Sequence, residues 1–185
     1  MKVIGITGLM GSGKTEVCKY LESKNYPVIY ADELGHQALE KESPIYFYLL
    51  KEFGTNNRKE LAKIVFAQPE KLKKLENLSH PVIFDLIQKE KKIFLKLQYS
   101  LIFVEAAVLF KMNVDKLCDE VWIIDAPEKE IISRLQKKGL KNDEILKRLS
   151  ANPIKDYVSK ADEVILNNGK LEELHKKIDE LINKL

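Results

Sequence analysis

A glycine-rich segment near the start of the chain has the residue types and spacing of a phosphate-binding loop. It runs from Gly8 through four residues to Gly13, Lys14 and Thr15, which matches the pattern G-x-x-x-x-G-K-[ST]. Glycines lack a β-carbon, so the main chain of such a loop can turn its N–H groups toward an anion. The lysine can reach the β- and γ-phosphates, and the threonine hydroxyl is a ligand for Mg²⁺. The segment therefore predicts the binding of a nucleoside triphosphate.

The residues on both sides of this loop match the strand and the helix that it requires. Residues 3–7 form a short apolar run typical of a buried strand, and residues 16–24 carry apolar side chains at helical spacing. The alternative, a glycine-rich turn that only connects a strand to a helix, explains the full motif less well. The predicted triphosphate-binding residues of this segment are Gly8, Gly11, Ser12, Gly13, Lys14, Thr15 and Glu16.

Length and composition fit one domain with a small insertion or lid. The chain has 185 residues, 45% of them hydrophobic, and a net charge of +3, an excess too small to favour nucleic acid over a phosphate-rich small substrate. No apolar run approaches membrane-spanning length, and Cys18 and Cys118 lie in apolar patterns typical of reduced core cysteines. We therefore expect a cytoplasmic protein that binds neither nucleic acid nor membranes and is a monomer or a weak homo-oligomer.

Two acidic residues follow predicted strands, so they are expected at the same edge of the sheet as the loop. Asp32 follows the strand 27–30, and Glu105 follows the strand 101–104. Asp32 could orient an attacking hydroxyl and accept its proton, or it could cap the helix predicted over 33–40; beside a phosphate loop the first role is favoured. Glu105 is at the position from which an acid reaches Mg²⁺, directly or through water.

A long segment between the second and third predicted strands, about 44–97, is helical throughout. Its apolar residues recur at helical spacing in four stretches, with a break at 79–81 before the last: residues 44–53, 58–66, 69–78 and 82–97. In a phosphate-loop kinase such an insertion usually holds the acceptor. Its polar candidates for substrate contacts are Arg58 and His80, and His36 on the preceding helix is a third. Arg58 could instead be a surface charge, His80 a helix-junction cap, and His36 a partly buried polar helix residue.

A basic segment follows the fourth predicted strand, residues 120–124. Arg134 lies in the last turns of a helix predicted over 128–138, several lysines follow, and Arg148 lies on the next helix. The positive charge could be a solvated face, which is common in a lysine-rich protein. The alternative is a lid, about 134–150, whose cations close over the triphosphate and neutralise charge during transfer. The lysines fit both interpretations, and the two arginines favour the lid.

Strands that alternate with helices predict a parallel sheet with right-handed crossovers. The fifth strand, 163–166, precedes a closing helix over 171–185. We expect an α/β chain with the three-layer P-loop NTPase fold: a five-stranded parallel sheet in a core of residues 1–43 and 98–185, the helical insertion and the lid. The chain has no Asp-x-x-Gly after the third strand and no Asn-Lys-x-Asp, so a switch GTPase is not favoured.

Several motifs together resemble the dephospho-CoA kinase family nearly from end to end. In order, they are residues 4–8 with 11–15, Ala31-Asp32 with Gly35-His36, residues 57–61 with Val65-Phe66, Leu78-Ser79-His80-Pro81, residues 104–109, the helix at Arg134, and residues 161–165 with Asn167-Asn168-Gly169. Many kinases share the first motif. The His-Pro element and the closing Ala-Asp to Asn-Gly element are much more specific in this order and spacing.

The resemblance implies a nucleoside-monophosphate-kinase-like fold and ATP-dependent phosphorylation of the ribose 3′-hydroxyl of dephospho-CoA, with Mg²⁺. It implies that Asp32 is the catalytic carboxylate beside that hydroxyl, acting with Lys14 and Arg134. Arg134 and Arg148 match lid and phosphate-contacting positions, and Asn167 lies in the loop that would border the adenine of ATP. A kinase for another nucleotide or nucleoside and a non-catalytic ATP-dependent switch are the alternatives, and the acids at two strand ends argue against the switch.

The chain departs from the family pattern at a few positions. Tyr30 stands where a first aspartate is often found, Lys138 where a second lid arginine is common, and Asn152 where glutamine is common. Lysine cannot make the planar two-point phosphate contact of arginine. These departures affect the expected lid contacts and leave the expected reaction unchanged.

Overall fold

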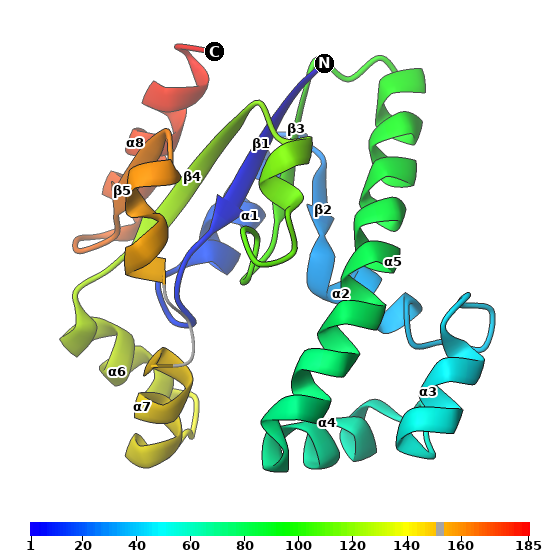
Figure 1. Cartoon of the computed structure of the whole chain (residues 1–185). Helices are drawn as coiled ribbons and strands as arrows, with labels where there is room; N and C mark the ends of the chain where they lie inside the picture. The colour runs from blue at the N-terminus through cyan, green and yellow to red at the C-terminus, as the bar shows by residue number, and fades with distance from the viewer. Residues whose placement is uncertain (151–153) are drawn as a thin grey trace. The chain divides into compact units, whose positions relative to one another are not determined.

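A parallel sheet of five strands forms the centre of the computed structural model, which describes residues 1–150 and 154–185 (Figure 1). Asn152 lies outside the described residues. The strand order is β2-β3-β1-β4-β5, and β1 pairs in parallel with β3 and β4, as β4 does with β5. The strands are β1 (Lys2–Thr7), β2 (Val28–Tyr30), β3 (Leu101–Glu105), β4 (Glu120–Asp125) and β5 (Glu163–Leu166). The predicted five-stranded parallel sheet is confirmed.

The central strands are buried because helices cover the sheet, which is why they read as apolar runs without alternation. β1, β3 and β4 bury almost every residue, and Phe103 and Trp122 are among the largest fully buried side chains. Helix α1 packs against α8, and the short helix η1 packs against β1. The other elements of this part are α1 (Lys14–Ser23), η1 (Val114–Leu117), α6 (Glu128–Lys137), α7 (Asn142–Ser150), η2 (Ile154–Lys160) and α8 (Leu171–Ile182).

Two aspartates fix the register of three neighbouring strands at their amino-terminal ends. Val3 donates its N–H to the Asp119 carboxylate at 2.7 Å, and Asp119 donates its own N–H to the Val3 carbonyl at 2.8 Å. Val121 and Asp162 repeat this reciprocal pair between β4 and the start of β5, at 2.7 and 2.9 Å. Each side chain thus satisfies a strand-end N–H that the sheet leaves unpaired.

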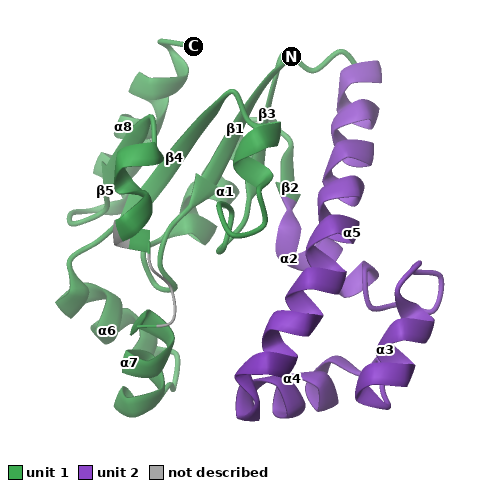
Figure 2. Ribbon diagram, viewed as in Figure 1, with its two compact units in different colours: residues 1–29, 98–185 green, residues 30–97 purple. Residues whose placement is uncertain are grey.

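The chain divides into two compact units, shown in Figure 2. Unit 1 comprises residues 1–29 and 98–185, and unit 2 comprises residues 30–97. Unit 2 is helical, with α2 (Ala31–Gln37), α3 (Tyr46–Phe53), α4 (Arg58–Ala67) and α5 (Pro69–Lys96) around a core of Ile45, Leu49, Phe53, Leu61 and Val65. It begins before the expected 44–97 insertion because α2 packs on α5 and Leu39 packs on this core.

The predicted break at 79–81 is wrong, because α5 runs without interruption through Pro81. Pro81 has no N–H to donate to the preceding turn, and a proline inside a helix normally ends or kinks it. The inward-facing positions nevertheless stay in phase on both sides of it, three or four residues apart: Leu72, Leu75, Ser79, Ile83 and Ile87. Packing of that continuous face outweighs the lost hydrogen bond.

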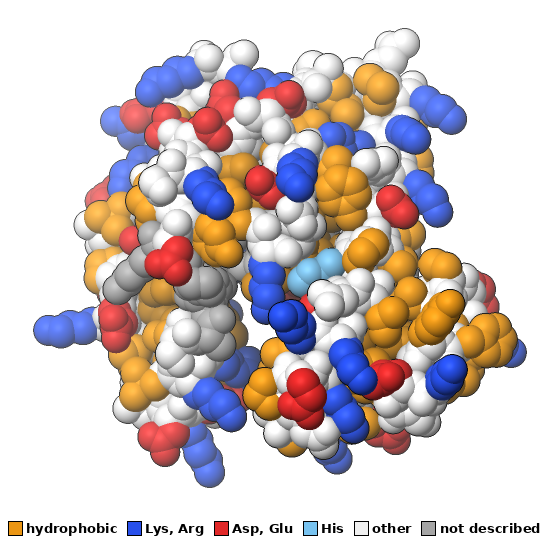
Figure 3. All heavy atoms as spheres, viewed as in Figure 1, with side chains coloured by type: hydrophobic (Ala, Val, Ile, Leu, Met, Phe, Trp, Pro, Cys, Tyr) orange, Lys and Arg blue, Asp and Glu red, His pale blue; other side chains and the backbone are white. Residues whose placement is uncertain are grey.

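Charges of both signs are mixed on the face of the molecule that Figure 3 shows, where lysine and arginine side chains are interspersed with acidic ones. None of the described helices is both long enough and apolar enough to span a membrane.

Candidate active site

The phosphate loop follows β1 and adopts main-chain conformations that require glycine. Gly8, Gly11 and Gly13 have φ values of 150°, 85° and 111°. A β-carbon on Gly8 would overlap the Ile124 carbonyl oxygen, so the loop also lies against the end of β4. Gly13 is the N-cap of α1, whose first N–H groups therefore face the loop, and the dipole of the helix adds positive potential there.

Lys14 is held at this loop by oxygen atoms from two strand ends. Its ammonium donates to the carbonyls of Gly8 at 2.9 Å and Leu9 at 3.3 Å, and it lies 3.8 Å from the Glu105 carboxylate. Glu105 reaches it because Ile6 and Glu105 are register partners in β1 and β3. Both side chains are nearly buried, and a buried charge is stable only with such partners. The structure thus brings together the lysine and the acid that the sequence placed at the same sheet edge.

Arg134 and Asn167 hold the outer side of the loop. The Arg134 guanidinium donates to the carbonyls of Gly11 and Ser12, each at 3.3 Å, and to the Asn167 carbonyl at 3.1 Å. Glu130, one turn earlier on α6, pairs with it at 2.6 Å. Asn167 is buried and donates its side-chain amide to the Ser12 carbonyl at 2.8 Å. The predicted role of Arg134 in charge neutralisation stays a prediction, since any approach to a phosphate would require release of these bonds.

The remaining residues predicted at the donor side lie on exposed helix turns. Thr15 and Glu16 are on the first turn of α1, where Glu16 pairs with Lys19 at 3.6 Å. Arg148 on α7 pairs with Glu144 and lies 3.6 Å from the Met10 sulfur of the loop. Met10 and Leu9 pack on the apolar cluster that α6 and α7 share, so these two helices are in contact with the phosphate loop.

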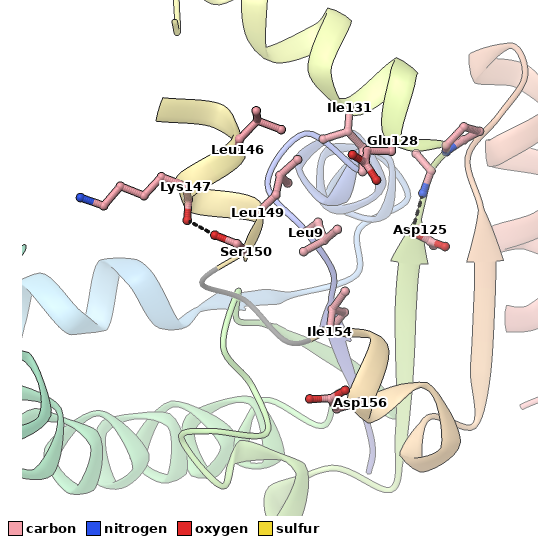
Figure 4. A pocket seen from close by; sticks show the side chains of 12 residues that line it. Leu9, Asp125, Glu128, Ile131, Leu146, Lys147, Leu149, Ser150, Ile154 and Asp156 are labelled. Atoms are coloured by element: carbon pink, nitrogen blue, oxygen red, sulfur yellow. Dashed lines mark hydrogen bonds between the residues drawn. The ribbon is translucent and has the colours of Figure 1, made fainter. Parts of the chain in front are cut away.

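A cavity of about 890 Å³ lies beside the loop, within unit 1 (Figure 4). Its apolar wall includes Leu9, Ile131, Leu149 and Ile154. Asp125, Glu128 and Asp156 also line it, and the Lys147 side chain points away from the other labelled residues. The cavity is therefore suited to an uncharged group rather than to phosphate.

The predicted acceptor-side residues all belong to unit 2. Asp32 and His36 are exposed on α2, Arg58 is the exposed first residue of α4, and His80 is half-buried in α5. Asp32 is not a helix cap: the N-cap of α2 is Tyr30, and no side chain caps that end. The structure brings Asp32 and His36 onto one short helix, and the approach of all four to a nucleotide stays a prediction.

The sequence analysis did not predict three acidic residues that support this site: Glu130, which pairs with Arg134, and Asp119 and Asp162, which fix the strand register. Glu130 was recognisable from its spacing, because residues four apart on a helix are neighbours, and it lies four residues before Arg134. Asp119 and Asp162 gave no such local signal, because their partners are distant in sequence.

Cys18 lies on α1, the helix that follows the phosphate loop. Burial, followed by the negative charge of Glu105, raises the pKa of the Cys18 thiol, so this cysteine is no nucleophile. Among the described residues no group of three or more His, Cys, Asp or Glu side chains is arranged for a metal ion.

A parallel sheet that presents a glycine-rich loop and a lysine between β1 and α1 defines a P-loop kinase fold. A crystal structure from Thermus thermophilus is similar, with a TM-score of 0.84, 33% identity, and coverage of 100% of this chain and 97% of that one. A crystal structure described as dephospho-CoA kinase from Campylobacter jejuni is 25% identical, with a TM-score of 0.73 and the same coverage.

The sequence comparisons identify the family. The sequence model of dephospho-CoA kinase matches residues 2–173. A dephospho-CoA kinase of Dehalococcoides mccartyi is 33% identical over 178 residues, which cover 91% of this chain and 89% of the relative. The chain belongs to the dephospho-CoA kinase family, whose reaction is the phosphorylation of dephospho-CoA to coenzyme A with ATP as the phosphate donor.

Proposed function

We propose that the chain catalyses this reaction as a Mg²⁺-dependent transfer of the γ-phosphoryl group of ATP to the ribose 3′-hydroxyl of dephospho-CoA. The observation that carries the proposal is the buried Lys14 ammonium, held beside Glu105 in a loop whose glycines adopt positive φ values. Phosphoryl transfer depends mainly on positioning and on charge stabilisation, and this loop is suited to both.

On the donor side, the loop amides and the first turn of α1 bind the phosphates. Lys14 exchanges its bonds to the Gly8 and Leu9 carbonyls for the β- and γ-phosphate oxygens. Arg148, whose contact with Met10 keeps α7 near the loop, adds positive charge. The lid of residues 134–150 closes over the nucleotide, and Asn167 borders it.

The oxygen ligands present fit Mg²⁺, which in kinases keeps several waters and uses few protein ligands besides phosphate. The Thr15 hydroxyl and the Glu105 carboxylate are hard oxygen donors at the loop. When bound, the ion neutralises phosphate charge. Glu105 also keeps Lys14 oriented through its 3.8 Å contact.

On the acceptor side, Asp32 orients the 3′-hydroxyl and accepts its proton. Its carboxylate is exposed and makes no hydrogen bond or ion pair with other described residues, so it is available to a substrate. His36, Arg58 and His80 bind other parts of dephospho-CoA, whose phosphates suit the histidines and the arginine. The enzyme acts in the cytoplasm as a monomer or a weak homo-oligomer.

The test combines ATP, Mg²⁺ and a panel of acceptors, with the product identified by mass spectrometry. We expect 3′-phosphorylated product from dephospho-CoA and none from nucleoside monophosphates. Phosphorylation of a nucleoside monophosphate but not of dephospho-CoA would instead support a kinase for another nucleotide.

The role of Asp32 has a matched control on the same helix turn. We expect Asp32→Asn to lower kcat by about 10²- to 10⁴-fold, the range of general base catalysis, with the Kd for ATP unchanged. Glu33→Gln changes the neighbouring exposed acid and should leave kcat within about twofold of wild type by the same measure. Unchanged turnover in Asp32→Asn would refute the role of Asp32.

A further inference from the structure

The carbonyl groups of the phosphate loop require hydrogen-bond donors, just as its N–H groups require an acceptor such as a phosphate. In a trans peptide the C=O and the N–H point in opposite directions. A loop that turns N–H groups inward therefore turns carbonyls outward, and a buried carbonyl without a donor is costly. The described residues contain no cis peptide bonds, so this rule applies to the peptide between Ser12 and Gly13.

Two distant segments supply the donors for the Ser12 carbonyl. The Asn167 side-chain amide reaches it at 2.8 Å from the end of β5, and Arg134 reaches it at 3.3 Å from α6. The same nitrogen of Arg134 also serves the Gly11 carbonyl. The N–H of Gly13, on the opposite side of the Ser12 peptide, makes none of the hydrogen bonds recorded among the described residues, so it is free for an anion.

Packing keeps both donors in place. A β-carbon on Gly13 would overlap the Asn167 amide nitrogen, and one on Gly11 would come within 3.0 Å of Leu135. Two neighbouring residues of α6 therefore contact the loop: Leu135 packs closely against Gly11, and Arg134 donates hydrogen bonds to its carbonyls. Glu130 fixes the guanidinium at 2.6 Å, and the Asn167 carbonyl accepts from its second nitrogen.

We propose that Arg134 and Asn167 are positioning residues, which hold the Ser12 carbonyl outward and so aim the Gly13 N–H at the phosphates of ATP. The inference rests on the proposed function only in that the loop binds these phosphates. It gives Asn167 a role in the shape of the loop in place of a contact with adenine. It likewise assigns Arg134 to the loop main chain and not to the transferred phosphoryl group.

Inorganic tripolyphosphate separates these roles because it has the phosphates of ATP without the base. Calorimetry should show that Asn167→Ala weakens tripolyphosphate and ATP by the same factor, about tenfold for one lost hydrogen bond. Loss of ATP affinity alone would assign Asn167 to adenine and overturn the proposal. Asn168→Ala, an exposed neighbour of the same type, should change neither affinity.

A double-mutant cycle tests whether both residues act through one carbonyl. With tripolyphosphate, Arg134→Ala combined with Asn167→Ala should weaken binding by less than the product of the single effects, because each single change already loosens the same peptide. Effects that multiply would mean independent contacts and would overturn the shared role. In turnover, the KM for ATP should rise in each single variant while the KM for dephospho-CoA stays unchanged.

Conservative variants keep the test valid if an alanine variant does not fold. In Arg134→Lys and Asn167→Asp, the amide ¹⁵N–¹H resonance of Gly13 should shift before any ligand is added. An unmoved Gly13 resonance in both variants would overturn the proposal. Failure of the proposed function is a different result: binding of ATP and tripolyphosphate by the wild type without phosphorylation of dephospho-CoA.

Discussion

The two compact units of the chain hold their functional groups in opposite ways. In unit 1, Lys14, Arg134 and Asn167 are bound to main-chain carbonyls or to carboxylates. In unit 2, Asp32 and Arg58 are exposed at helix starts, on helices whose own buried positions are apolar. The difference suggests that the phosphate site is formed before any ligand arrives.

This contrast has a thermodynamic meaning for a two-substrate enzyme. A preformed site has little conformational entropy left to lose, whereas exposed side chains must be ordered when the ligand binds. We therefore expect ATP to bind with little rearrangement of its loop. The acceptor residues should become ordered only with dephospho-CoA.

The largest effect is expected at Gly8 in unit 1, and Gly35 in unit 2 is its counterpart. Gly8→Ala forces a β-carbon against the Ile124 carbonyl at a positive φ, so we expect no detectable turnover and a loss of about 2 to 4 kcal/mol in the free energy of unfolding. Gly35→Ala in α2 meets only Ile83, at 3.6 Å, and should raise that free energy by about 0.5 to 1 kcal/mol. Urea unfolding and steady-state kinetics measure both; equal stability losses would remove the contrast.

Thiol labelling tests whether helix α1, which follows the loop and carries Cys18, keeps this thiol inaccessible to solvent. Cys18 is fully buried with a raised pKa, whereas Cys118 is partly exposed and its thiol donates to the Val114 carbonyl. At pH 8 we expect Ellman's reagent to react with one thiol, and the Cys118→Ser variant to react at least about 100-fold more slowly than Cys18→Ala. Similar rates in the two variants would show that the helix under the loop opens readily.

Two prolines of α5 sharpen the description of unit 2. Pro81 is exposed in the helix interior, so Pro81→Ala should restore a hydrogen bond and raise the free energy of unfolding by about 1 to 3 kcal/mol. Pro69 is the first residue of the same helix, where proline is favoured, and Pro69→Ala should change it by less than about 0.5 kcal/mol. A destabilised Pro81→Ala would mean that the proline itself contributes to packing.

The smallest effect is expected from the surface pair of Glu52 and Lys74, which joins α3 to α5. The hydrogen bond from Lys74 lowers the pKa of Glu52 from its ordinary 4.5. The stabilisation is therefore present above pH 4.5 and is lost as the pH falls through the lowered value. At pH 7, Lys74→Met should unfold at a slightly lower urea concentration than the wild type, and at pH 2.5 the two midpoints should be equal. The control, Lys73→Met, should have the midpoint of the wild type at both pH values.

Local patterns were sufficient to predict the sheet and the loop. The glycines, Lys14 and the strand ahead of them are neighbours in sequence, so spacing alone specified their geometry. Glu105 was found because residues at the carboxyl ends of parallel strands meet at one edge.

The rest depended on contacts that no local pattern reveals. Residues 79–81 looked like a break because proline outweighed the helical periodicity, whose phase continues across it. Arg134 was predicted as a lid residue, and its bonds to the Gly11 and Ser12 carbonyls were not predicted, because these carbonyls are more than a hundred residues away. Every residue has a main-chain carbonyl, so the residue type at the loop does not reveal that its carbonyl accepts a hydrogen bond from a distant side chain.

Asp119 and Asp162, at the opposite end of the sheet from the phosphate loop, fix the strand register on which the position of Asn167 depends. Asp162 fixes the register at which β5 begins to pair with β4. Each strand residue adds about 3.3 Å, and Asn167 lies five residues after Asp162, where its side-chain amide reaches the Ser12 carbonyl. Removing one residue from β5 would draw Asn167 below the loop and turn alternate side chains to the wrong face. A carboxylate far from any substrate thus determines where an amide meets the nucleotide loop.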